Sequence, residues 1–177
     1  MANELQKFSD GLAAAVEKAA QSIVTVDARR RFPATGIVWS AGGEILTADH
    51  VLEVDFLKRV EKKPGMGLPV ETPVPTDEKV NVILPEGKEY AASIVGRDPA
   101  SDLALLKIDA QGLTVPEFVE DLKVGHLVFA VGRPDRVQAT LGSVVALGGP
   151  VRGRFRALEA YIQTDVTMYP GYMVTSV

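Results

Sequence analysis

The sequence has no cysteine, which excludes disulfide bonds, thiolate catalysis and cysteine-based zinc sites. Only two histidines occur among its 177 residues, His50 and His126, and they lie far apart without clustered carboxylates. Because a metal site needs several ligands at suitable spacing, we expect no metal. No glycine-rich phosphate loop precedes a helix, so no cofactor is expected either.

Long hydrophobic runs and a strong net charge are also lacking. No apolar stretch is long enough to span a bilayer. The formal net charge of −4 gives no reason to expect nucleic acid or an anionic membrane as a partner. The chain opens with Met1, Ala2, Asn3 and Glu4 and continues as an amphipathic stretch, which is unlike a signal peptide. From these residues alone, we expect a cytoplasmic protein.

Aromatic residues are few, at 6%, whereas the 16 glycines and 11 prolines are many for this length. This balance is typical of short strands joined by turns. The exception is residues 4–20, where apolar side chains recur every three or four positions and predict an amphipathic helix that docks on a barrel end. Those side chains are Leu5, Phe8, Leu12, Val16 and Ala19.

After residue 20, the hydrophobic period changes to two, which predicts strands. The first set covers residues 22–28, 36–40, 44–47, 79–85, 89–97 and 103–108, and the second covers 127–132, 139–147 and 160–164. Two sets of short strands with frequent turn signals predict two β-barrels. We therefore expect an N-terminal helix at 1–20, a first barrel at 21–112 and a partial second barrel at 113–177.

Two segments fit this pattern poorly. Residues 54–77 hold four prolines and are predicted to be a loop insertion. Because this insertion follows His50 closely, we expect a lid or contact loop near that residue. Residues 151–158 are predicted to be a second exposed loop.

His50 and Asp102 are the candidate catalytic residues. His50 comes just after a predicted strand, and Asp102 directly precedes the apolar run at 103–108. Taken singly, each has an ordinary explanation, as an exposed histidine and as a turn residue. Asp98, which precedes Pro99, is however the better turn-former. A buried aspartate that accepts the Nδ1–H of a histidine holds the imidazole so that its other nitrogen can deprotonate a serine.

Five motifs resemble the HtrA/DegP type of trypsin-like, chymotrypsin-fold serine protease. In order they are GIVWSAGGEILTADHVL, VILPEGKEYAASIVGRDPASDLALLKI, VGHLVFAVGRP, ATLGSVVALGG and YIQTDVTMYPG, within residues 22–171. The resemblance implies an all-β fold with two six-stranded barrels and endopeptidase activity on polypeptides. It implies that His50 is the general base and Asp102 its orienting partner, whereas His126 has no role beyond a turn. Family members are often found in the cell envelope or periplasm.

The resemblance fails at the nucleophile. It implies that Ser-Gly-Gly follows the Pro-Gly turn, with the oxyanion hole near Gly171, but here Tyr172 is followed by Met173. A thioether has no proton to give to a base. Either Met173 stands in the place of the serine, or residues 173–177 match a later strand and about fifteen residues are absent. Ser176 follows three residues later in an apolar run without a glycine turn.

The sequence therefore predicts a serine endopeptidase domain that is inactive because it lacks the serine. The alternative is a catalytically dead protease fold that acts as a binding or scaffold module. An unrelated small β-barrel binding module would require the histidine and aspartate motifs to be a coincidence. An incomplete second barrel has open strand edges, so we also expect homo-oligomers.

Overall fold

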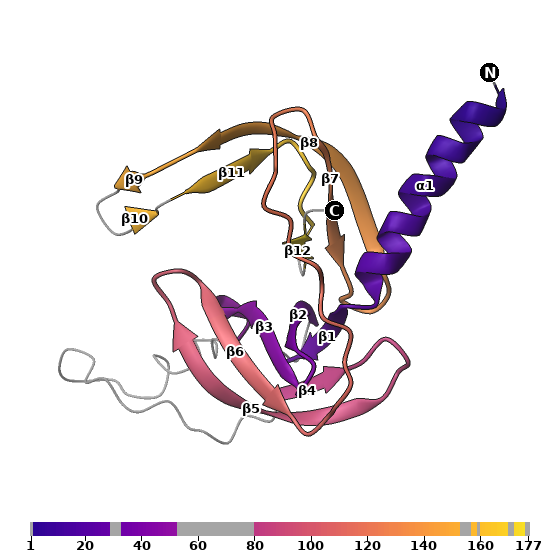
Figure 1. Cartoon of the computed structure of the whole chain (residues 1–177). Coiled ribbons are helices and arrows are strands. Elements are labelled where there is room, and N and C mark those ends of the chain that lie inside the picture. Colours follow the sequence, from indigo (N-terminus) through magenta and orange to yellow (C-terminus); the bar gives the residue numbers. More distant parts are fainter. Residues whose placement is uncertain are drawn as a thin grey trace, which may run out of the picture.

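The computed structural model describes residues 2–28, 33–52, 80–152, 157–158, 160–169 and 172–175. Its single long helix, α1 (Ala2–Ala20), projects from two β-sheet units (Figure 1). The C-terminal half of α1 packs against Ile23, Phe129 and Val131. Leu5 and Phe8, in the other half, are 71% and 55% exposed. The predicted helix is confirmed, but only its second half is docked.

The first unit is a closed six-stranded barrel in the order β1-β2-β3-β6-β5-β4. Its elements are β1 (Ile23–Asp27), β2 (Ala34–Ser40), β3 (Glu44–Ala48), the short 3₁₀ helix η1 (Asp49–Leu52), β4 (Val80–Ile83), β5 (Glu89–Asp98) and β6 (Leu103–Ile108). Aliphatic side chains fill the interior and leave no room for another at Gly36, where a Cβ would lie 2.6 Å from the Ile45 side chain. Glycine at this position lets the barrel close tightly.

The second unit is a four-stranded antiparallel sheet in the order β11-β8-β7-β12. Its strands are β7 (Leu127–Gly132), β8 (Gln138–Gly148), β11 (Tyr161–Thr164) and β12 (Tyr172–Thr175). Strands β9 (Val151–Arg152) and β10 (Ala157–Leu158) form a short ladder. The prediction of a loop over 151–158 was therefore wrong at its two ends, where β9 and β10 continue the β8–β11 arm seen in Figure 1, and residues 153–156 lie outside the described part of the chain.

The two units repeat one pairing pattern. In the first barrel, β1 pairs with β2 and β4, and β2 pairs with β3. In the second sheet, β7 pairs with β8 and β12, and β8 pairs with β11. Strand β12 thus occupies the place of a fourth strand. Within the described residues, no strands correspond to β5 and β6, so the second barrel is incomplete, as predicted.

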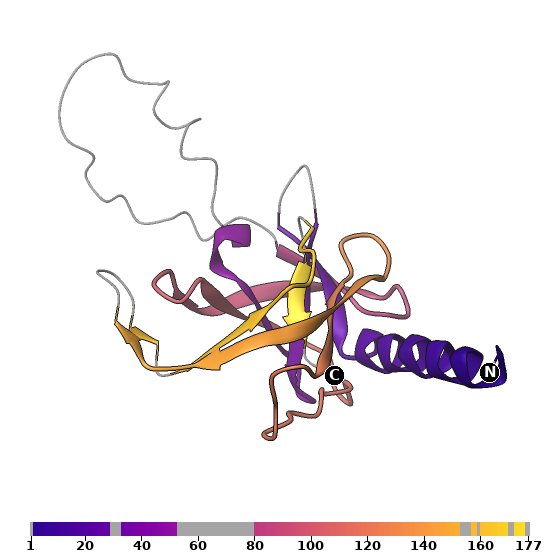
Figure 2. The same ribbon diagram turned by 90° about the horizontal axis from the view of Figure 1, so that it is seen from above.

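Residues 109–126 connect the units without regular strands and pass under the sheets in Figure 2. Edge-to-face contact between Trp39 and Phe118, with ring centroids 5.5 Å apart, fixes this connection to β2. Lys18 and Glu117 form an exposed ion pair at 2.8 Å, which links the connection to α1. Among the described residues, no helix has the length and apolar character needed to cross a membrane.

Candidate active site

The turn η1 presents one side chain to solvent and buries the others. Val51 and Leu52 join the core of the first barrel, and Asp49 is buried as well. The side chain of His50 is 58% exposed. Because its neighbours on both sides are anchored, His50 is held at the barrel surface in a defined orientation.

Asp102 ends the turn between β5 and β6, with its backbone at φ 58°. Aspartate tolerates this left-handed conformation better than most residues. Asp98 shapes the turn, because its carboxylate accepts hydrogen bonds from the Ala100 N–H at 3.1 Å and the Ser101 hydroxyl at 2.6 Å. The prediction that Asp98 is the turn-former is confirmed.

The structure brings His50 and Asp102 into direct contact. The His50 Nδ1 lies 3.0 Å from Oδ1 and 2.8 Å from Oδ2 of Asp102. The backbone N–H of His50 also donates to Oδ1 at 2.9 Å, and that of Asp49 donates to the Asp102 carbonyl at 3.1 Å. An ionised carboxylate only accepts hydrogen bonds, so Nδ1 carries the proton and Nε2 is left as the basic nitrogen.

A feature that the sequence reasoning missed lies next to this contact. The Arg97 guanidinium donates to the Asp49 carboxylate through Nε at 2.5 Å and Nη2 at 3.0 Å. The only signal in the sequence is an acidic residue, Asp49, directly before a histidine and two apolar residues. Its partner is 48 positions away and has no motif of its own.

In the second sheet, the end of β11 is fixed by Asp165. Its carboxylate accepts the Ser143 N–H at 2.5 Å, and a Cβ at Gly142 would lie 2.6 Å from the same carboxylate. Gly171, expected near the oxyanion hole, lies outside the described residues. Tyr172 and Met173 pair with Gly132 and Val131 as part of β12. The backbone at position 173 is thus in a sheet ladder and does not form a glycine turn.

His126 and the 54–77 insertion were also singled out in the sequence. His126 follows a turn directly before β7, and its Nδ1 accepts the Lys123 N–H at 3.3 Å. This is the turn position expected from the sequence. The insertion lies outside the described residues.

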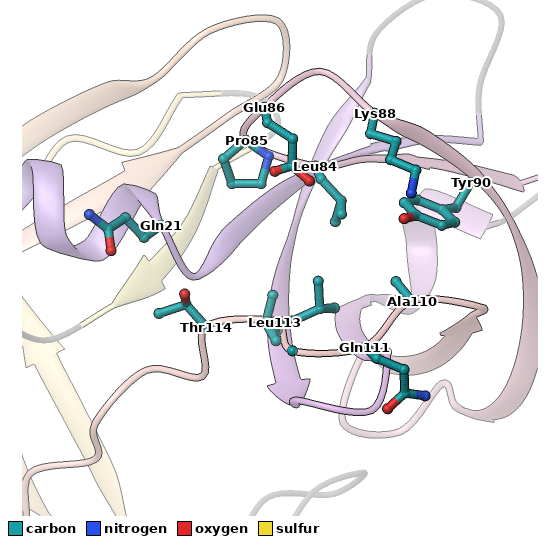
Figure 3. Close-up of a pocket in the computed structure, with 12 residues that line it drawn as sticks. Gln21, Leu84, Pro85, Glu86, Lys88, Tyr90, Ala110, Gln111, Leu113 and Thr114 are labelled. Atoms are coloured by element: carbon teal, nitrogen blue, oxygen red, sulfur yellow. The ribbon is translucent and has the colours of Figure 1, made fainter.

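A pocket of about 460 Å³ opens at the other end of the first barrel (Figure 3). Leu84, Glu86 and Ala110 line it, and Lys88 lies over the Tyr90 ring at 4.7 Å from the ring centroid. Asp102 directly precedes β6, whereas Ala110 lies two residues beyond the other end of that strand. The pocket is therefore separated from the His50–Asp102 contact by the length of the barrel.

Known proteins resemble this chain over most of its length. The model of the "Trypsin-like peptidase domain" family matches residues 34–173. A "Probable periplasmic serine endoprotease DegP-like" of Chlamydia pneumoniae is 32% identical over 140 residues, covering 77% of this chain and 24% of the relative. A protein of the same description from Pseudomonas fluorescens is 33% identical over 141 residues, with 77% and 25% coverage. The chain thus spans about a quarter of the length of these curated relatives.

Among solved structures, that of Deg5 superposes with a TM-score of 0.67 at 25% identity, covering 95% of this chain and 80% of Deg5. This likeness includes the closed barrel and the open sheet. The family match and these relatives show that the chain belongs to the trypsin-like peptidase domain family and is of the HtrA type.

Proposed function

We propose that this chain is a serine-endopeptidase-type domain in which His50 and Asp102 form the general-base pair but peptide hydrolysis does not occur. The observation that carries the proposal is the contact between the His50 Nδ1 and the Asp102 carboxylate at 2.8 Å, together with a strand over 172–175. The family consists of serine endopeptidases, and their reaction needs both a base and a nucleophile.

The chemistry explains why the pair alone is insufficient. The Nε2 of His50 is the basic nitrogen and could remove a proton from a hydroxyl. At the position where the family resemblance expects that hydroxyl, the sequence has Met173, whose thioether has no such proton. The tight glycine turn that would direct backbone N–H groups at an oxyanion is also replaced by a β12 ladder.

A second candidate function is the binding of an extended polypeptide without cleavage. Within the described residues, β11 pairs only with β8 and β12 pairs only with β7, so each has one open edge. Open edges accept an added strand through backbone hydrogen bonds. Since the relatives are named as endoproteases, a polypeptide is also the partner that the family favours.

Insertion of the segment that the family resemblance implies tests the proposal. The variant would insert Ser-Gly-Gly followed by a strand and a turn, about fifteen residues in all, between Tyr172 and Met173. We expect the parent chain to leave a fluorogenic casein substrate intact and the insertion variant to cleave it. The matched controls carry the same insertion with alanine for the serine, or with His50→Ala, and should be inactive.

Two results would overturn the proposal. Cleavage by the parent chain that His50→Ala abolishes would show that a nucleophile is present. A folded insertion variant that neither cleaves casein nor reacts with a fluorophosphonate at the inserted serine would contradict the assignment of His50 and Asp102 as a base pair. For the compartment, the names of the relatives favour the periplasm, and fractionation of cells that express this protein tests this.

A further inference from the structure

Asp49 is a buried acid directly beside the candidate base. It is 2% exposed, whereas His50, the next residue, points to solvent. A buried carboxylate is costly unless hydrogen bonds and an opposite charge compensate it. Arg97 supplies both, through its bonds from Nε and Nη2 to the two carboxylate oxygens and a longer bond from Nη2 to the Asp49 carbonyl at 3.4 Å.

A β-bulge brings Arg97 to the correct face of β5. The register between β5 and β6 shifts between Ile94 and Gly96, so that Arg97 is opposite Ala104 and not opposite Leu103. Paired residues lie on the same face of a sheet, and Ala104 is 1% exposed on the interior face. Without the extra residue, Arg97 would lie on the outer face with Leu103, away from Asp49.

The hairpin formed by β5 and β6 therefore contacts η1 at two places. The turn at its tip provides Asp102, whose carboxylate and carbonyl accept the backbone N–H groups of His50 and Asp49. Strand β5 provides Arg97, which binds the Asp49 side chain. These contacts hold both the backbone of η1 at His50 and the side chain of Asp49, the residue before it, in fixed positions.

We propose that Asp49 and Arg97 are positioning residues that keep the Nδ1 of His50 directed at Asp102. This rests on the proposed role of His50 and Asp102 as a base pair. The charges of Asp49 and Arg97 do not touch the reacting atoms. They act through η1, because a two-bond guanidinium–carboxylate contact fixes orientation as well as distance. Replacing a buried ion pair by apolar groups often leaves the free energy of unfolding unchanged. A contribution to stability alone therefore does not explain why the Asp49–Arg97 pair is buried beside His50.

Imidazole NMR of ¹⁵N-labelled protein tests this inference without relying on hydrolysis. The spectrum contains two histidines, and His126 is a reference remote from η1. At a pH where both rings are neutral, we expect His50 of the parent chain in the Nδ1–H form. In Asp49→Asn and Arg97→Met, roughly half or more of that form should be lost to the Nε2–H tautomer, with His126 unchanged.

The controls separate positioning from stability. Glu117→Gln breaks an exposed ion pair of similar length and should leave the His50 signal unchanged. Arg97→Lys keeps the charge but loses the two-bond geometry, so it should retain part of the Nδ1–H form. If Asp49→Asn does not fold, this lysine variant decides the question, and a full Nδ1–H signal in it would overturn the inference.

The remaining outcomes distinguish the inference from the proposed function. A parent chain whose His50 is in the Nε2–H form would contradict both the base pair and its positioning. The other outcome is that His50 is in the Nδ1–H form in the parent chain and stays in that form in the variants, while the variants unfold at a lower temperature. This outcome would overturn only the positioning role. In that case Asp49 and Arg97 stabilise the barrel and nothing more.

Discussion

The backbone of Asp102 lies in the left-handed region, at φ 58°, and this conformation aims two acceptors of one residue at η1. The Asp102 carbonyl accepts a hydrogen bond from the Asp49 N–H. The Asp102 carboxylate accepts hydrogen bonds from the backbone N–H and from the ring Nδ1 of His50. Non-glycine residues with positive φ are uncommon and occur where surrounding contacts hold them. The orientation of His50 thus depends on one unusual residue.

Asp102→Asn separates the charge of this residue from its shape. Asparagine tolerates the same backbone conformation and can keep its oxygen on the His50 N–H, so the free energy of unfolding should fall by only about 1 kcal/mol. Its amide group would then face Nδ1 as a donor, and the ring should change to the Nε2–H tautomer. Imidazole NMR checks the tautomer and urea unfolding checks the stability. An unchanged Nδ1–H form would contradict the assigned contact.

Gly43 and Gly87 both have positive φ, at 100° and 87°, but their surroundings differ. A Cβ at Gly43 would collide with the backbone carbonyl of Ile108. A Cβ at Gly87 would have no other atom within 4 Å. We expect Gly43→Ala to lower the free energy of unfolding by about 3 kcal/mol and Gly87→Ala by about 1 kcal/mol. Chemical denaturation measures both. Equal losses would show that the tight approach of β6 to the β2–β3 turn is not present.

At the scale of elements, α1 carries one apolar stripe that is used along only half of its length. Leu12 packs against the cluster of Ile23, Phe129 and Val131, whereas Leu5 is 71% exposed. Leu12→Ala should therefore lower the free energy of unfolding by about 2 kcal/mol, and Leu5→Ala should change it by less than about 0.5 kcal/mol. Thermal unfolding of the two variants side by side checks this. A large effect of Leu5→Ala would mean that the projecting half is also packed.

The same helix shows what the sequence can and cannot predict. Its period identified the helix and its apolar face, because both follow from local geometry. How far the partner surface extends depends on where β7 lies, which no local pattern contains. The strands at 103–108 and 127–132 were predicted at their observed ends, since apolar runs bounded by turn signals define them. The β9–β10 ladder was missed because two-residue strands carry no periodicity.

For the candidate site, His50 and Asp102 were predicted from their motifs, and the structure brings their side chains into contact. Asp49 and Arg97 were not found, because their contact depends on a one-residue bulge in β5. Sequence alternation predicts the face of a side chain only while the register is regular. A bulge reverses that prediction for every residue after it.

At the scale of the whole molecule, Arg133 joins three parts of the chain. Its carbonyl accepts the Thr25 hydroxyl at 2.7 Å, its N–H donates to the Thr35 hydroxyl at 2.8 Å, and its Nη2 donates to the Ala20 carbonyl at 2.9 Å. The first two bonds connect the end of β7 to the first barrel, and the third caps α1. Burial lowers the pKa of this guanidinium, which reflects the cost of removing it from water.

Arg133→Met keeps the backbone bonds and removes the helix cap. We expect the free energy of unfolding to fall by about 1–2 kcal/mol, because a charged hydrogen bond is lost and part of its desolvation cost is recovered. Arg136→Met, at an exposed position three residues away, is the matched control and should have an effect below about 0.5 kcal/mol. If the two variants are equally stable in urea unfolding, Arg133 does not join the helix to the two sheets.

The central claim is that the family's base pair is present and its nucleophile is absent. The most direct test is the intact mass of the purified chain after exposure to an excess of a fluorophosphonate, which labels activated serines. We predict no adduct, and the same spectrum for His50→Ala. A single stoichiometric adduct on the parent chain that disappears in His50→Ala would show an activated serine, and would contradict the account.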